Sequence, residues 1–356
     1  MIPACIIGVG GYSGAGKTTL IEKALPHLKR MGLYVGVLKH AGLHGLAVDP
    51  EKKDTDRFFR AGADFVFAHD AEQGFSRYPA DSMGLSGALE RFPRSLDLVL
   101  VEGHKEADIP RIWLEKGRSP GQKGCLQDTS GHILFRGDPA CLDRFLKCVR
   151  QELGRSMKER TVHAGLLVGG RSGRMGRPKG LLKVNGETLM ERSVATLSKV
   201  AHRVVLAGSA RLPAGLSGMD RLPDIPGGRG PLSGMMSCFR WSPDSAWFIS
   251  AVDMPFMTTD AWQWLLSKRS PGAWAVLPRL WNSRKVEAAG ALYEPMIFGF
   301  VESLAEKGVS ALQAISDHPK VIKPVIPSAL AHAWRNVNTL AEWRGAKADL
   351  RSRGWA

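Results

Sequence analysis

The sequence predicts two α/β domains in tandem, each with a mostly parallel sheet covered by helices on both faces. In both halves, strand-like apolar runs alternate with helix-like amphipathic runs, a pattern typical of parallel strands joined by crossover helices. In each half, the first apolar run leads directly into a glycine-rich loop, residues 4–10 into 11–18 and residues 164–168 into 169–179. A chain of 356 residues also suits two domains better than one core.

The composition is that of a globular protein without a membrane segment. Hydrophobic residues make up 44% and charged residues 23% of the chain, as in ordinary soluble domains. No run approaches the roughly 20 apolar residues of a membrane helix, and the short apolar run near the start has no basic region before it, so we expect no signal peptide. The five cysteines include no C-x-x-C pair, which favours a reducing cytoplasm over a disulfide framework or a zinc site.

The formal net charge of +15 has two interpretations. One is nucleic-acid binding, and the other is binding of anionic small molecules such as nucleotides and phosphorylated cofactors. The basic residues are dispersed, without a run of five or six like charges. We therefore favour small phosphorylated ligands and expect neither nucleic acid nor a membrane as a partner.

The elements of the first half follow in order. Residues 4–10 are apolar and predict a buried strand. The next apolar side chains fall on one face of a helix over 17–30 that stops at Gly32; they are Leu20, Ile21, Ala24, Leu25 and Leu28. Further strands are expected over 34–38, 64–68 and 96–103, helices near 54–61 and 139–153, and a polar linker over 154–160.

Residues 11–18 are a complete G-x-x-x-x-G-K-[ST] phosphate loop (P-loop) between a strand and a helix, the context that this motif requires. Glycines let successive backbone N–H groups face one anion, and the helix N-terminus adds its positive dipole end. Lys17 would reach the outer phosphates, and the Thr18 hydroxyl would hold Mg²⁺. The sequence predicts a nucleotide site made by Gly11, Gly14, Ala15, Gly16, Lys17, Thr18, Thr19 and Glu102. His40 and His104 follow strand ends nearby and would act as a polar rim or as catalytic groups.

The second half restarts the pattern at residue 163. A strand over 164–168 runs into the loop 169–179, where Gly169, Gly170 and Gly173 permit close backbone approach and Arg174 and Lys179 supply fixed cations. This loop lacks the G-K-[ST] ending, so the halves are not repeats. A turn is expected over 181–186, a helix over 188–199, and strands over 203–207, 246–252 and 273–277.

Two carboxylates follow in positions suited to catalysis. Asp253 stands at the end of the strand 246–252, and Asp224 precedes the glycine- and proline-rich loop 226–232. Ligands bind at the carboxyl ends of strands in open α/β sheets, and a strand-end carboxylate is well placed for Mg²⁺. A metal-binding Asp with Lys and Arg on the same ligand is what nucleotidyl transfer requires, because charge develops on the α-phosphate and the leaving pyrophosphate.

These residues resemble two known families. The stretch 167–179, L-V-G-G-R-S-G-R-M-G-R-P-K, resembles the signature of the molybdenum cofactor guanylyltransferase MobA, with further matches at 230–235, 252–256 and 336–339. The first half resembles the partner protein MobB in the P-loop and at 38–40, 48–49 with Asp54, 60–63 and 98–105. The resemblance predicts a natural fusion of a P-loop NTPase-like, MobB-like GTP-binding domain over 1–155 with a Rossmann-like, MobA-like nucleotidyltransferase domain over 161–346.

The resemblance implies transfer of GMP from Mg·GTP to the terminal phosphate of molybdopterin, giving molybdopterin guanine dinucleotide and pyrophosphate. It implies catalytic roles for Arg174, Lys179 and Asp253, of which Asp253 would hold Mg²⁺; no general base is assigned, because the attacking phosphate is already an anion. The nucleoside would contact Leu167, Val168, Gly169, Gly170 and Asp224, and molybdopterin would lie near Asn336 and Asn338. Implied partners are molybdoenzyme apo-proteins, cofactor-synthesis proteins and a second copy bound through the MobB-like domain.

The chain departs from the family patterns at three places. Val168 replaces the usual Ala. Ala207-Gly208-Ser209 stands where the family often has Asn after the strand, so that contact is either lost or supplied by backbone groups. The His- and Asp-rich stretch after Lys39-His40 is thinned over 41–49. We therefore expect the first half to bind GTP rather than to turn it over.

Four alternatives remain. A cytidylyltransferase of the same superfamily would have L-A-A-G, whereas Gly169-Gly170 and Gly-Pro-Leu at 230–232 favour GTP. In a second alternative, the N-terminal half is a non-catalytic adapter. It would bind GTP and deliver GTP or product to the C-terminal domain, to which a short linker connects it. A sugar-phosphate nucleotidyltransferase is a third alternative, and the Asn336–Thr339 motif and the MobB-like half argue against it. A nucleic-acid-binding ATPase is the fourth, and only the net positive charge favours it.

Overall fold

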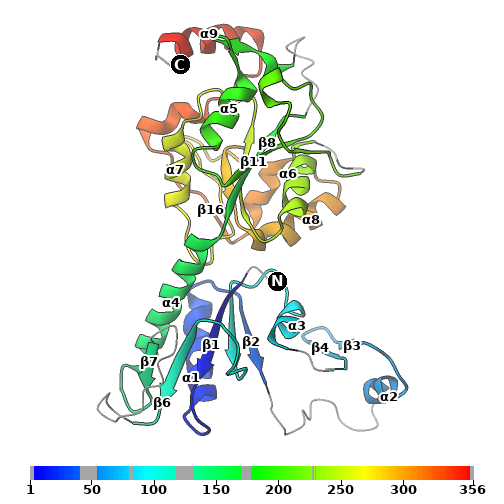
Figure 1. Cartoon of the computed structure of the whole chain (residues 1–356), viewed down its shortest axis with the longest axis vertical. Coiled ribbons are helices and arrows are strands. Elements are labelled where there is room, and N and C mark those ends of the chain that lie inside the picture. Colours follow the sequence, from blue (N-terminus) through cyan, green and yellow to red (C-terminus); the bar gives the residue numbers. More distant parts are fainter. Residues whose placement is uncertain are drawn as a thin grey trace.

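The computed structural model describes residues 4–40, 54–79, 84–117, 132–169, 178–226, 228 and 230–352. Two α/β domains are stacked along the long axis of the molecule, and helix α4 (Cys141–Glu159) runs from one to the other (Figure 1). The tandem α/β prediction is confirmed. Across the described ranges, no helix is both long and apolar enough to cross a bilayer.

The first domain is built on five parallel strands in the order β2-β5-β1-β6-β7. The central strand carries the P-loop at its carboxyl end, so loops from its neighbours on both sides reach that loop. The strands are β1 (Cys5–Gly10), β2 (Val35–Lys39), β5 (Leu98–Glu102), β6 (Arg111–Glu115) and β7 (His132–Phe135). The last two strands were not predicted, because each is short and partly polar.

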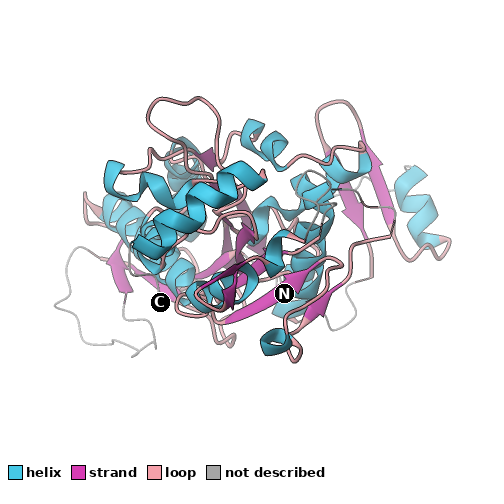
Figure 2. Cartoon of the chain, turned by 90° about the horizontal axis from the view of Figure 1, so that it is seen from above, coloured by secondary structure: helices cyan, strands magenta, loops and turns pink. Residues whose placement is uncertain are grey.

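Helices cover both faces of this sheet, because the central strands are apolar on both sides. Leu98 and Leu100 pack with α1 (Lys17–Arg30) and α4, whereas Val99 and Val101 pack with α3 (Leu85–Glu90) on the opposite face. Figure 2 looks along the long axis of the molecule, so the strands of both domains overlap in it, with helices on either side. The alternation of these valines and leucines in one strand thus sets the three-layer architecture.

A small module, which we call the arm, stands to one side of this domain (Figure 1). It consists of α2 (Asp54–Arg60) and the antiparallel hairpin of β3 (Val66–His69) and β4 (Gly74–Arg77). The strand predicted over 64–68 exists here, but it pairs with β4 rather than joining the parallel sheet. The reason is local, since the Asp70 carboxylate accepts hydrogen bonds from two backbone N–H groups, those of Glu72 and Gln73, at 2.8 Å and closes a tight turn.

The second domain has a seven-stranded sheet in the order β12-β11-β8-β13-β15-β14-β16. All neighbours are parallel except β15, which is antiparallel to both β13 and β14. The strands are β8 (Val162–Leu167), β11 (Arg203–Ala207), β12 (Arg221–Leu222), β13 (Ala246–Ala251), β14 (Ala275–Val276), β15 (Ala291–Tyr293) and β16 (Val321–Ile322).

Four helices cover the two faces of this sheet. On one face lie α6 (Gly230–Trp241) and α8 (Phe298–Glu306), and on the other lie α5 (Leu189–Leu197) and α7 (Thr259–Ser267). Helix α9 (Leu340–Ser352) packs on the small ribbon of β9 (Lys183–Val184) and β10 (Glu187–Thr188) through Trp343 and Val184. Short 3-10 turns occupy Lys179–Leu181, Ala214–Leu216, Pro295–Ile297, Leu312–Asp317 and Ser328–Trp334.

The predicted linker over 154–160 is wrong, because α4 continues to Glu159. Ion pairs within the helix support its last turns: Arg155 contacts Glu152 at 2.6 Å and Glu159 at 3.5 Å. Arg160 then contacts Glu294 of the second domain at 2.8 Å, and β8 begins at Val162. The domains are therefore joined by a continuous helix rather than by a flexible tether.

A buried ion pair joins the two domains at what we call the joint, made by Tyr34, Asp97, Trp274 and Lys320. Asp97 is only 3% exposed and pairs with the Lys320 ammonium. Its carboxylate also accepts hydrogen bonds from the Trp274 indole N–H and the Tyr34 backbone N–H, each at 2.7 Å. Lys320 Nζ lies 4.1 Å from the Tyr34 ring centroid. Burial lowers the pKa of Lys320, and the Asp97 carboxylate opposes this shift.

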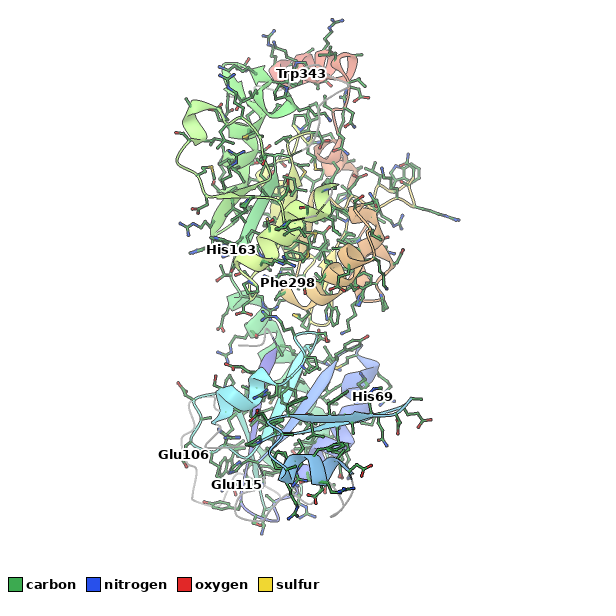
Figure 3. All side chains as sticks on the ribbon, turned by 90° about the vertical axis from the view of Figure 1, so that its right-hand side faces the viewer. His69, Glu106, Glu115, His163, Phe298 and Trp343 are labelled. Atoms are coloured by element: carbon green, nitrogen blue, oxygen red, sulfur yellow. The ribbon has the colours of Figure 1, made fainter. Side chains whose placement is uncertain are left out.

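The parallel strands of both sheets begin at the joint and end away from it. Cys5, which starts β1, lines one small cavity together with Asp97 and Ala273, which precede β5 and β14. In Figure 3, Glu115 at the carboxyl end of β6 lies near one end of the molecule, and Trp343 on α9 lies at the other. The carboxyl edges of the two sheets therefore face in opposite directions.

Candidate functional site

The P-loop follows β1 and has the backbone shape that its glycines permit. Gly14 and Gly16 have φ of 71° and 94°, in the left-handed region that favours glycine. Gly16 caps α1, so the first turn of that helix points its N–H groups into the loop. The Lys17 ammonium donates to the carbonyls of Gly11 and Tyr12 at 3.1 and 3.0 Å. Ala15 is buried, whereas Thr19 is exposed in the first turn.

Thr18 and Glu102 come together on the β5 side of the loop. The Thr18 hydroxyl donates to the Glu102 carboxylate at 3.1 Å, across 84 residues of sequence. A hydroxyl and a carboxylate at the start of a nucleotide-binding helix are oxygen donors of the kind that Mg²⁺ prefers. These residues fit the predicted metal position on the β5 side of the loop.

His40 and His104 also meet on this side, with ring centroids 4.7 Å apart. His104 has φ of 46°, an uncommon conformation for a side-chain-bearing residue. The buried Arg111 holds its turn by donating to the carbonyls of His104 and Ala107 at 3.0 and 3.1 Å. Burial lowers the pKa of His104, and the charges of His40 and Arg111 lower it further. The sequence placed both rings near the nucleotide but did not predict this pairing.

Two further cations lie on the other side of the loop and were missed by the sequence analysis. Lys116 directly follows β6, and Arg136 directly follows β7. The Arg136 guanidinium donates to the Gly14 carbonyl at 3.2 Å. Their strands were not recognised, so no sequence signal placed these cations at the P-loop.

In the second domain, the loops after β8 and β11 touch. A Cβ on Gly208 would lie 2.8 Å from the backbone N of Gly169, and Gly208 has φ of 106°, so the approach requires glycine. The Asp224 Oδ2 lies 3.8 Å from the Cβ position of Gly169. Leu167 and Val168 are buried, and the Val168 backbone N–H donates to the Ala207 carbonyl at 2.9 Å, which ties the start of the loop to β11. The backbone of Gly208 and Ser209 thus occupies the place where the family often has Asn.

Lys179, Asp253 and Asn338 converge at the carboxyl end of β13. Lys179 Nζ lies 3.5 Å from Asp253 Oδ2 and donates to Asn338 Oδ1 at 2.8 Å. The backbone N of Val337 donates to the Asp253 carbonyl at 2.8 Å, which fixes the two segments against each other. Three residues predicted from separate motifs are thereby brought into one cluster. Asn336 is exposed beside it.

Two acidic residues near this cluster were missed. The Glu342 carboxylate accepts hydrogen bonds from the backbone N–H groups of Asn338 and Thr339 at 2.6 and 3.3 Å, and the Glu342 backbone N–H donates to the Thr339 hydroxyl oxygen at 3.2 Å. This capping box at the start of α9 orients Asn338. Burial raises the pKa of Glu287; the charge of Asp253 raises it as well, while Lys285 lowers it. The T-x-x-E spacing at 339–342 was a usable signal, whereas nothing in the local sequence marks Glu287.

Some predicted residues lie outside the described residues. They are Gly170, Gly173 and Arg174 of the second glycine-rich loop, and the thinned stretch 41–49 of the first half. The described part of the chain still brings Lys179, the Asp253 carboxylate and close-packed glycines to one sheet edge in the second domain. It also brings a complete phosphate loop to one edge of the sheet in the first domain.

Comparison with known proteins agrees with this division. The family described as MobA-like NTP transferase domain matches residues 164–348, and the family described as molybdopterin guanine dinucleotide synthesis protein B, MobB, matches residues 6–133. A probable molybdenum cofactor guanylyltransferase of Deinococcus radiodurans is 28% identical over 54% of this chain and 94% of its own length.

Adapter proteins match the first half. The molybdopterin-guanine dinucleotide biosynthesis adapter protein of Escherichia coli is 31% identical over 43% of this chain and 80% of its own length. That of Haemophilus influenzae is 40% identical over 31% of this chain, which spans only 63% of that relative. The chain therefore belongs to the MobA-like NTP transferase family through its second domain and to the MobB family through its first.

Proposed function

We propose that the second domain transfers GMP from GTP to the terminal phosphate of molybdopterin, giving molybdopterin guanine dinucleotide and pyrophosphate. The observation that carries the proposal is the cluster of Lys179, Asp253 and Asn338 at the carboxyl end of β13. Membership in the MobA-like family and the name of the Deinococcus relative, a probable molybdenum cofactor guanylyltransferase, support the choice of nucleotide and acceptor.

The chemistry asks for positioning and charge rather than for a strong base. An oxygen of the acceptor phosphate forms a bond to the α-phosphorus of GTP, while the bond from that phosphorus to the bridging oxygen of pyrophosphate breaks. The attacking oxygen is already anionic, so no proton has to be removed. Lys179 would neutralise charge on the triphosphate, and Arg174 is proposed to assist it from the glycine-rich loop. The backbone at 167–170 and Asp224 would hold the nucleoside.

Mg²⁺ is proposed to bind Asp253, whose carboxylate lies at a strand end beside Lys179. When bound, Mg²⁺ would supply further positive charge to the triphosphate. Asn338 is suited to orient the acceptor, because its side-chain Oδ1 accepts from Lys179 while its backbone N–H donates to Glu342 at the start of α9. Asn336 is proposed to line the same molybdopterin side.

The test uses molybdopterin, Mg²⁺ and either GTP or CTP, with pyrophosphate release and dinucleotide formation as readouts. We expect product with GTP and little with CTP, because Gly169-Gly170 stands where a cytidylyltransferase of this superfamily would have L-A-A-G. Comparable rates with both nucleotides would refute guanylyl selectivity. Absence of transfer from folded protein with either nucleotide would redirect the search to a sugar-phosphate acceptor.

The first domain is proposed to be a GTP-binding adapter that engages molybdoenzyme apo-proteins or cofactor-synthesis proteins. Its support is the intact P-loop with the Thr18–Glu102 pair, together with the names of the MobB relatives. The P-loop lies at the opposite end of the molecule from the Lys179 cluster, so the transferase site does not need it for its own chemistry.

Replacing Lys17 by alanine should remove nucleotide binding by the first domain and leave GMP transfer within about twofold of wild type. Isothermal titration with GTP should show one site fewer, while pyrophosphate release is retained. Lys23→Ala is the matched control, since Lys23 is an exposed lysine on the same helix. Complete loss of transfer in the Lys17 variant would contradict the adapter proposal.

The first domain is also proposed to form a homodimer through the arm. Phe58, Phe65 and Phe67 on this module each have more than half of their surface exposed, and clustered exposed aromatic residues commonly mark an interface. A second copy would present the same face, as a two-fold interface requires. Phe67→Asp should shift sedimentation equilibrium toward monomer, whereas Trp281→Asp on the second domain should not. A wild-type chain that stays monomeric at high micromolar concentration would refute the proposal.

A further inference from the structure

The two sides of the P-loop have different chemistry. The Thr18–Glu102 pair lies on the β5 side, which is therefore the proposed side of the metal and of the terminal phosphates. On the other side of β1 lie β6 and β7, whose carboxyl ends deliver Lys116 and Arg136. A nucleoside triphosphate whose outer phosphates lie at Lys17 and Thr18 therefore extends its nucleoside toward β6 and β7.

Arg136 is fixed against the loop although its side chain is exposed. Its Nη1 donates to the Gly14 carbonyl at 3.2 Å, and its Cδ and Nε lie 3.2 Å from the Cβ position of Gly16. Its backbone N–H donates to the Glu115 carbonyl at 2.9 Å, which ties it to the sheet edge. Gly16 is thus required for its positive φ, and a side chain there would also press on Arg136.

Lys116 lies on the same side of the P-loop as Arg136. Its Nζ lies 3.5 Å from the Cβ position of Gly14. Nearby, the exposed Tyr12 packs edge-on against Trp113, with ring centroids 5.9 Å apart. Two cations and an aromatic face therefore adjoin the end of the loop that lies away from the metal side.

Guanine and adenine differ on the base edge that carries N7 and the position-6 group, which a nearby cation could contact by hydrogen bonds. Guanine offers two acceptors, O6 and N7, whereas adenine offers the N7 acceptor and an amino donor. Arg and Lys carry donors only. We propose that Arg136, with Lys116 beside it, recognises the guanine base in the P-loop site and selects GTP over ATP. This inference rests on the proposed nucleotide binding by the first domain and adds the residues that choose the base.

The experiment measures GTP and ATP binding to the full chain by isothermal titration calorimetry. All variants carry Lys179→Ala, which weakens nucleotide binding by the second domain, and the same chain with Lys17→Ala defines the signal that belongs to the P-loop. Arg136→Met keeps an unbranched, flexible stem but removes the guanidinium donors and the positive charge. We expect GTP affinity to fall about tenfold or more and ATP affinity to stay within about twofold.

Arg30→Met is the matched control, because Arg30 is exposed at the opposite end of α1 and should leave both affinities unchanged. An equal loss for GTP and ATP would overturn the inference, since Arg136 would then bind phosphate. Unchanged GTP affinity would overturn it as well. A chain that binds neither nucleotide before Arg136 is changed would instead refute nucleotide binding by the first domain, so the two failures are distinguishable.

Discussion

Asp253→Ala is expected to lower kcat/KM for GMP transfer by about 10³-fold or more, because it removes the proposed Mg²⁺ ligand and the partner of Lys179 together. The loss should appear mainly in kcat, since the charge that these groups stabilise develops during transfer. Steady-state pyrophosphate release over a range of GTP and Mg²⁺ concentrations measures it. A variant that keeps a tenth of the wild-type rate would contradict the assignment.

Asp260→Ala is the matched control for this prediction. Asp260 is an exposed acid in the first turn of α7, seven residues away in sequence. Its removal should leave transfer within about twofold of wild type, because an exposed first-turn acid contributes only to the helix dipole. Far-UV circular dichroism and the melting temperature of both variants separate lost chemistry from lost structure.

Asp97→Ala is expected to lower the free energy of unfolding by about 3–5 kcal/mol, because it leaves the buried Lys320 ammonium unpaired. The Trp274 indole N–H and the Tyr34 backbone N–H would lose their acceptor in the same step. Urea unfolding followed by circular dichroism measures the overall loss. Hydrogen exchange of the Tyr34 amide measures the local effect, and that amide should lose its protection.

Two further variants serve as controls for this prediction. Asp97→Asn keeps an acceptor but not the charge, so its loss should be smaller than that of the alanine variant. Asp244→Ala removes an ion pair with Arg94 that also crosses between the domains but is half exposed, and it should cost less than about 1 kcal/mol. If Asp97→Ala unfolds at the wild-type urea concentration, the joint does not stabilise the chain.

Sequence reasoning predicted what is encoded locally. The P-loop is a contiguous motif between a strand and a helix, and Asp253 ends a strongly apolar strand, so both follow from short windows. Lys179 and Asn338 are 159 residues apart, and only resemblance to a family placed them in one site before their 2.8 Å contact was seen. The predicted roles of Gly170 and Arg174 remain predictions.

The misses have physical causes. β6 and β7 are short and carry polar residues at their ends, so Lys116 and Arg136 could not be placed beside the P-loop. The polar stretch after Leu153 suggested a linker, yet its charges form ion pairs along one helix and continue α4. Asp97 and Lys320 are separated by 223 residues and belong to different domains, so their pairing depends on a domain arrangement that no local pattern encodes.

The opposed carboxyl edges of the two sheets, held apart by α4 and the joint, have a consequence for how fusion serves the cell. A small molecule released at one edge must diffuse through solvent around the protein to reach the other, so sharing one chain gives it no shorter route. Fusion instead fixes the stoichiometry, since every ribosome that makes one transferase also makes one P-loop domain. A large partner protein bound at the P-loop end could still extend to the carboxyl edge of the second sheet. Such a partner would then connect the two ends of the molecule in one reaction sequence.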